Sequence, residues 1–140
     1  MNTPAPAEWL EPLQLWRAMQ LGQACYLDVR TSAEFIAGHP AGAAHVALYE
    51  DGAAGRRLQP EFVAHVRALR ATLPPTCVIV VGCRTGARSG LALQVLRASA
   101  IAGLAHFPGG WAGGTDSWGR VTAVGWLASG LPTATSDAIC

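Results

Sequence analysis

Short apolar runs alternate with longer amphipathic segments along this chain. Residues 24–29 and 77–81 are almost entirely apolar and contain β-branched or aromatic side chains, which predicts buried strands. Residues 45–48 and 104–107 predict two further strands. Between these runs, apolar residues recur at helical spacing near 12–22, 60–72 and 89–101. This alternation of strands and helices indicates an α/β fold, a parallel sheet with helices on both faces.

Each helical segment has one set of apolar residues that we expect to face the core. The first is opened by Pro12 and the second by Pro60, as is common at the first turn of a helix. A shorter helix is expected around residues 34–36, capped by Thr31 or Ser32. The expected core-facing residues are Leu13, Trp16 and Met19, then Phe62, Val63, Val66 and Leu69, and finally Leu91, Val95, Ala98 and Ile101.

Length and composition fit one domain with a well-filled core. The chain has 140 residues, of which 51% are hydrophobic and 14% charged, a balance that argues against disorder. The net charge of +1 gives no reason to expect binding to nucleic acid or to an anionic membrane. The first residues do not resemble a secretory signal, and no apolar run approaches the roughly 20 residues that span a bilayer. We therefore expect a cytoplasmic protein.

The richest chemistry lies where the central strand ends. Residues 82–88 form a tight glycine-containing loop that leads into a helix, with Cys83 at its head. Such a loop directs backbone N–H groups to one point, where the helix dipole adds positive potential. Cysteine pKa values fall from about 8.5 to roughly 3.5–7.5 near helix N-termini and cationic side chains. Loop amides and Arg88 are expected to hold an anion, which is the thiolate, a persulfide or a bound oxyanion. Arg84 points either into the mouth of this site or to solvent.

The remaining cysteines and histidines are interpreted as structural. Cys25 and Cys77 lie in or beside apolar strand runs and are expected to be small buried hydrophobes. Cys140 ends a polar tail that we expect to be mobile, so a role in resolving a persulfide is the minor alternative. No cysteine or histidine spacing matches a metal site. His39 is expected to hydrogen bond to the backbone of its own loop rather than to act as a base.

Four motifs, in order, resemble the single-domain rhodaneses, the thiosulfate sulfurtransferase family. They are CRTGARS at 83–89, LDVR at 27–30 with EF at 34–35 and GHPAGA at 38–43, FPGGW at 107–111, and GLP at 130–132. The resemblance runs from about Glu8 to Pro132. It implies a rhodanese-like fold of about five strands, with the active loop between the central strand and the following helix. The domain would occupy residues 8–132, after a flexible N-terminus at 1–7 and before a C-terminal tail at 133–140.

The resemblance also implies a site and a reaction. Cys83 would be the catalytic nucleophile, and Asp28 and Arg30 would support the loop from a neighbouring strand. The expected substrate-binding residues are Arg84, Thr85, Gly86, Ala87, Arg88 and Ser89. Sulfane sulfur would pass from thiosulfate or a related donor, through a cysteine persulfide, to cyanide in vitro or to a thiol or protein cysteine in the cell. Neither a metal nor an organic cofactor would be needed.

Two other functions remain open. A persulfide carrier that receives sulfur from a protein donor would have the same cysteine and little thiosulfate activity. Phosphatases and arsenate reductases of the same fold are a further alternative, but the resemblance implies that phosphatases use a wider Cys-x5-Arg loop. Here Cys83 and Arg88 bound a Cys-x4-Arg loop, the size that handles sulfur in the family.

The segment 111–126 is longer than the corresponding segment of the family pattern. This stretch contains Asp116, Trp118, Arg120 and Trp126. Two interpretations are open: a loop whose tryptophans pack against the fold, or a segment that walls the mouth of the Cys83 site or meets a partner protein.

Overall fold

The centre of the fold is a four-stranded parallel sheet. The computed structural model describes residues 8–136, and its main sheet has the order β3-β1-β6-β7. The strands are β3 (Ala44–His45), β1 (Ala24–Asp28), β6 (Val78–Gly82) and β7 (Leu104–His106). About five strands were expected. Within residues 8–136, a single parallel bridge between Glu8 and His106 lies beyond β7, so the described part of the main sheet has four strands.

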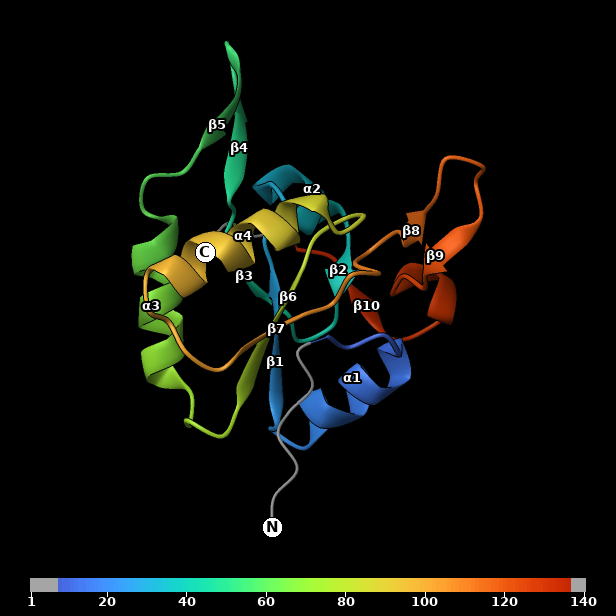
Figure 1. Cartoon of the computed structure of the whole chain (residues 1–140), viewed down its shortest axis with the longest axis horizontal. Coiled ribbons are helices and arrows are strands. Elements are labelled where there is room, and N and C mark those ends of the chain that lie inside the picture. The colour runs from blue at the N-terminus through green and yellow to red at the C-terminus, as the bar shows by residue number, and fades with distance from the viewer. Residues whose placement is uncertain (1–7, 137–140) are drawn as a thin grey trace.

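Helices cover both faces of this sheet, as the alternating pattern predicts (Figure 1). One face packs Leu27, Val29, Ile79 and Val81 under α3 (Phe62–Thr72) and α4 (Ala87–Ala98). The other packs Tyr26, Val80 and Ala105 under α1 (Pro12–Gln20) and the C-terminal segment. Side chains along β1 and β6 alternate between the two clusters because successive residues of a strand point to opposite faces. The predicted α/β class is confirmed.

The core-facing residues of two helices differ from the expected ones. In α1, the buried residues include Leu15 and Ala18, whereas Leu13 is 45% exposed. In α4, Leu91 is exposed and the buried face is formed by Ser89, Ala92, Leu93 and Leu96. Small apolar residues occur on every side of α4, so the spacing of apolar residues alone did not identify the buried face. The expected inward face of α3 is confirmed, with Phe62 and Val66 fully buried.

Three antiparallel pairs surround the sheet. The stretch 49–59, whose glycines and polar residues predict a loop, forms instead a hairpin of β4 (Tyr49–Gly52) and β5 (Gly55–Leu58). It projects beyond the end of the sheet at which β6 leads towards α4 (Figure 1). A second hairpin joins β8 (Gly114–Thr115) and β9 (Val121–Ala123). The third pair joins β2 (His39–Pro40) to β10 (Thr133–Ala134). A short helix, α2 (Ser32–Ala37), and a 3-10 turn at Leu127–Ser129 complete the described elements.

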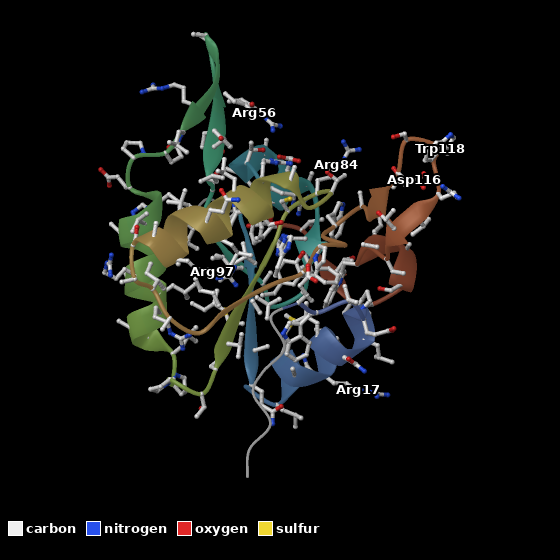
Figure 2. All side chains as sticks on the ribbon, viewed as in Figure 1. Arg17, Arg56, Arg84, Arg97, Asp116 and Trp118 are labelled. Atoms are coloured by element: carbon white, nitrogen blue, oxygen red, sulfur yellow. The ribbon has the colours of Figure 1, made fainter. Side chains whose placement is uncertain are left out.

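The long segment 111–126 is anchored in the core at its far end. Trp126 is fully buried and contacts the rings of Trp16, Tyr26 and Phe107 in edge-to-face geometry. Its indole Nε1 donates to the Pro132 carbonyl at 3.0 Å. Trp118, in contrast, is 79% exposed in the connection between β8 and β9 (Figure 2). The segment is therefore a hairpin that packs through one tryptophan and exposes another.

Candidate active site

Cys83 lies directly after the central strand β6, at the carboxyl edge of the sheet where α/β proteins form their sites. The loop from Cys83 to Gly86 turns tightly into α4. Gly86 has φ of 105°, and a Cβ atom there would lie 2.9 Å from the Pro108 carbonyl oxygen, so glycine is required. Backbone N–H groups of Trp111 and Ala112 donate to the carbonyls of Cys83 (2.8 Å) and Arg84 (2.9 Å). The loop is thus held in place by the segment that follows β7.

The Cys83 sulfur sits in a polar cradle although the residue is only 1% exposed. The Gly86 N–H donates to Sγ at 3.1 Å, and Ser89 Oγ lies 3.3 Å from the same atom. Gly86 is the N-cap residue of α4, so its N–H belongs to the positive end of that helix. Among the amides of the loop in residues 8–136, that of Gly86 is the one that hydrogen bonds to the sulfur. Cys83 also belongs to the apolar cluster under α3 and α4, so these are two polar contacts in an otherwise apolar setting.

Arg88 is held by an acidic partner that the sequence analysis did not assign to it. Its guanidinium donates to both carboxylate oxygens of Glu34, at 2.6 Å and 3.0 Å. Glu34 is also part of a capping box with Thr31 at the start of α2. The Arg88 hydrogen bonds, aided by the Thr31 contacts, lower the pKa of Glu34 to about 2, against a desolvation that opposes the shift. The same pair raises the pKa of Arg88.

Asp28 and Arg30 form a buried ion pair behind the loop. Arg30 donates to the Asp28 carboxylate at 2.7 Å and to the Gly38 carbonyl at 2.6 Å, and its Cζ lies 5.0 Å from the centre of the Trp111 ring. The pair therefore connects the end of β1 to the segments that contain Gly38 and Trp111. A pair between Arg30 and Glu34, which their spacing of four residues permits, does not form, because Asp28 binds the Arg30 guanidinium.

His39 takes the structural position expected of it. Its Nδ1 lies 2.7 Å from the Phe35 carbonyl oxygen, and its ring stacks on the Phe35 ring. These contacts hold the connection between α2 and β2. The ring is buried and its interactions are with backbone and aromatic carbon, not with Cys83.

A cavity of about 380 Å³ opens beside the loop. Arg84 is exposed and is one of the residues that line this cavity (labelled in Figure 2). Thr85 and Ala87 are also exposed, while Ser89 is fully buried. The full lining consists of Arg30, Glu34, Ala37, Gly38, Arg84 and Trp111.

One residue near the sulfur escaped the sequence analysis. His106, near the end of β7, has its Nε2 2.7 Å from Ser89 Oγ. Spacing along the sequence does not connect the two, since they lie on different elements. The strand register was the missing signal: β6 and β7 pair Val81 with His106, which brings the histidine beside the start of the active loop.

The other described cysteines lie away from this chemistry. Cys77 immediately precedes β6, and Cys25 is near the start of β1, at the end of the sheet opposite Cys83. Burial raises the pKa of Cys25 to about 11 and also raises that of Cys77, so both thiols stay protonated near neutral pH. Cys140 lies outside the described residues. In residues 8–136, no group of three or more potential ligands is arranged to hold a metal ion, and no helix could cross a bilayer.

The chain belongs to the rhodanese-like domain family, whose profile matches residues 11–119. Thiosulfate sulfurtransferase 16, chloroplastic, of Arabidopsis thaliana is 33% identical over 108 residues, which cover 77% of this chain and 78% of that protein. Senescence-associated protein DIN1 of Raphanus sativus is 32% identical over 102 residues, which cover 71% of this chain and 54%, about half, of that relative. The crystal structure of Rv0390 from M. tuberculosis superimposes with a TM-score of 0.68 at 27% identity, covering 94% of this chain and 100% of that one.

Replacing Glu34 with glutamine should make the fold less sensitive to acid. Because the folded state lowers the Glu34 pKa from 4.5 to about 2, the ionised carboxylate stabilises the fold above about pH 4.5. That contribution falls away as the pH drops towards about 2. We expect Glu34→Gln to cost about 1 kcal/mol at neutral pH, a value reduced for partial exposure.

Urea unfolding midpoints measured from pH 7 down to acid would test this expectation. The wild-type midpoint should fall more steeply through the acid range than the midpoint of Glu34→Gln. Glu61→Gln, which changes an exposed carboxylate just before α3, is the matched control and should keep the wild-type slope. Parallel plots of urea midpoint against pH for wild type and Glu34→Gln would contradict the stabilising role of the Glu34–Arg88 pair.

Proposed function

We propose that this protein is a sulfurtransferase that moves sulfane sulfur from thiosulfate, or a related donor, to a thiophilic acceptor through a Cys83 persulfide. The observation that carries the proposal is the environment of the Cys83 sulfur. The Gly86 N–H at the start of α4 donates to that atom, and Ser89 Oγ lies 3.3 Å from it. The relative named as a thiosulfate sulfurtransferase supports the same chemistry.

The proposed reaction has two steps. The Cys83 thiolate attacks the outer sulfur of thiosulfate, a sulfur–sulfur bond forms to Cys83, and the bond to sulfite breaks as sulfite leaves with its electron pair. The resulting persulfide carries the negative charge on its outer sulfur. In the second step, cyanide or a thiolate attacks that outer sulfur, and the Cys83 thiolate is regenerated. Charge balances in both steps when the acceptor is cyanide, because thiocyanate leaves with one negative charge.

The arginines around the loop have different tasks in this proposal. Arg84 is exposed at the cavity edge, where a cation attracts an anionic donor such as thiosulfate. Arg88 is half-buried and partly neutralised by Glu34, so it acts through its field while the Gly86 amide makes the direct contact. That Arg88 favours a sulfur anion on Cys83 remains a prediction.

Transient kinetics of the two half-reactions test the proposed function. Thiosulfate alone should release one sulfite per protein in a burst, and steady-state rates with cyanide should follow ping-pong kinetics. A protein that releases no sulfite but rapidly accepts sulfur from a protein persulfide would be a carrier instead. Turnover of a phosphate or arsenate substrate, without sulfur transfer, would instead indicate a phosphatase or an arsenate reductase.

A further inference from the structure

A serine hydroxyl connects the Cys83 sulfur to an imidazole. Ser89 Oγ lies 3.3 Å from Cys83 Sγ and 2.7 Å from His106 Nε2. The three side chains come from the end of β6, the first turn of α4 and the end of β7. Cys83 and Ser89 are fully buried, whereas His106 is only half-buried and can exchange protons with solvent.

The geometry permits a proton to pass between sulfur and nitrogen through the hydroxyl. When the thiol is intact, S–H donates to Ser89 Oγ and the serine O–H donates to Nε2. When the proton moves, the S–H bond breaks, the serine passes on its own hydrogen, and an N–H bond forms on His106. The thiolate then accepts the serine O–H. The Gly86 carbonyl, 3.1 Å from Ser89 Oγ, is an alternative acceptor for the same hydrogen, so the hydroxyl can rotate between partners.

We propose that His106 is a positioning residue that takes up the Cys83 thiol proton through Ser89, so that Cys83 meets its sulfur donor as a thiolate. The reaction in this inference rests on the proposed function. Its geometry rests on the observed contacts among the three side chains. The proton is returned to solvent from the partly exposed imidazole, and no oxidant or cofactor is required.

The surroundings of His106 keep its imidazole in the neutral form. Burial lowers the pKa of His106, and Arg97 on α4 lowers it further, while Glu8 beside β7 and the Gly86 carbonyl act in the opposite direction. Burial has the largest effect, so the ring is neutral at neutral pH and Nε2 can accept the serine hydrogen bond. The same burial disfavours the imidazolium, so the proton that His106 takes up is passed on to solvent and is not kept on the ring. Glu8 and Arg97 are the charged groups that face the ring, and Cys83 reaches it only through Ser89.

His106→Gln is the most direct test, because glutamine can accept a hydrogen bond but cannot take up a proton. The rate of persulfide formation from thiosulfate should fall by about tenfold near neutral pH, the change in thiolate fraction that accompanies about one pKa unit. The loss should shrink as the pH rises, because hydroxide then ionises the thiol directly. The transfer from persulfide to cyanide breaks no S–H bond and should be unchanged. His65→Gln, on the exposed side of α3, is the matched control.

A double-mutant cycle tests the route through serine. If the proton passes through Ser89, then Ser89→Ala, His106→Gln and the double variant should all show a similar loss of persulfide formation. Losses that multiply would mean that the two side chains act independently and would overturn the inference. A His106→Gln loss that is equal at every pH, or equal in both half-reactions, would assign His106 a purely structural role and would also overturn it.

A second readout separates this inference from the proposed function. The rate of Cys83 alkylation by iodoacetamide, followed by peptide mass, depends on the thiolate and needs no sulfur donor. In His106→Gln, its pH profile should move upward by about one unit. If wild-type protein formed no persulfide from thiosulfate but the alkylation profile moved, the proposed donor would be wrong and the His106 assignment would stand. An unchanged pH profile of alkylation would contradict the role proposed for His106 and would leave the proposed function unaffected.

Discussion

Replacing Cys83 with serine should abolish sulfur transfer and leave the fold intact. Serine has nearly the same shape, so the contacts of the loop with Gly86 and Ser89 can persist. Its hydroxyl is not ionised at neutral pH and does not attack the outer sulfur of thiosulfate. Loss of a covalent nucleophile lowers turnover by about 10⁴-fold or more, and we expect a loss of that order in thiosulfate–cyanide turnover.

The control for this substitution is a second cysteine of the same protein. Cys25 is half-buried at the opposite end of the sheet, and its thiol stays protonated, so Cys25→Ser should keep wild-type turnover. Thermal unfolding of both variants would show that each is folded. Turnover retained by Cys83→Ser, or lost in a well-folded Cys25→Ser, would contradict the assignment of the nucleophile.

Replacing Trp126 with alanine should destabilise the fold more than any surface change. The side chain is fully buried, it contacts three aromatic rings, and its indole nitrogen donates to the Pro132 carbonyl. Removing a buried tryptophan costs about 3–5 kcal/mol, through the lost transfer energy and the cavity left behind. We expect a loss of that size in the free energy of urea unfolding.

Two companion variants make the test specific. Trp126→Phe keeps an aromatic ring and removes one of two donors to the Pro132 carbonyl, which still accepts from the Ala41 N–H at 3.1 Å, so it should cost less than alanine. Trp118→Ala removes a tryptophan of the same segment that is almost fully exposed, and it should change stability by less than about 0.5 kcal/mol. Equal losses at Trp118 and Trp126 would show that the segment is not anchored in the way described.

The sequence predicted the parts of the fold that local chemistry determines. The apolar run before Cys83, the glycine at position 86 and the helix that follows are each readable from a few neighbouring residues. Prolines at 12 and 60 mark the regions in which two helices begin, and the helix that begins at Phe62 buries the predicted face. Parallel topology with helices on both faces follows from the order of these elements.

Features that depend on distant contacts were not predictable in the same way. The partner of Arg88 is Glu34, 54 positions away, and the partner of Ser89 is His106, on a separate strand. Their pairing depends on strand register, which spacing within one element does not contain. The β4–β5 hairpin was missed for another reason, because polar residues and two glycines give it the composition of a loop.

The measurement that tests the account most directly is the intact mass of the protein before and after exposure to thiosulfate. We expect wild-type protein to gain the mass of one sulfur atom and to lose it again on addition of cyanide, while Cys83→Ser gains nothing. Peptide mapping should place the added sulfur on residue 83. No mass gain in wild-type protein, or the same gain in the serine variant, would contradict a Cys83 persulfide formed from thiosulfate.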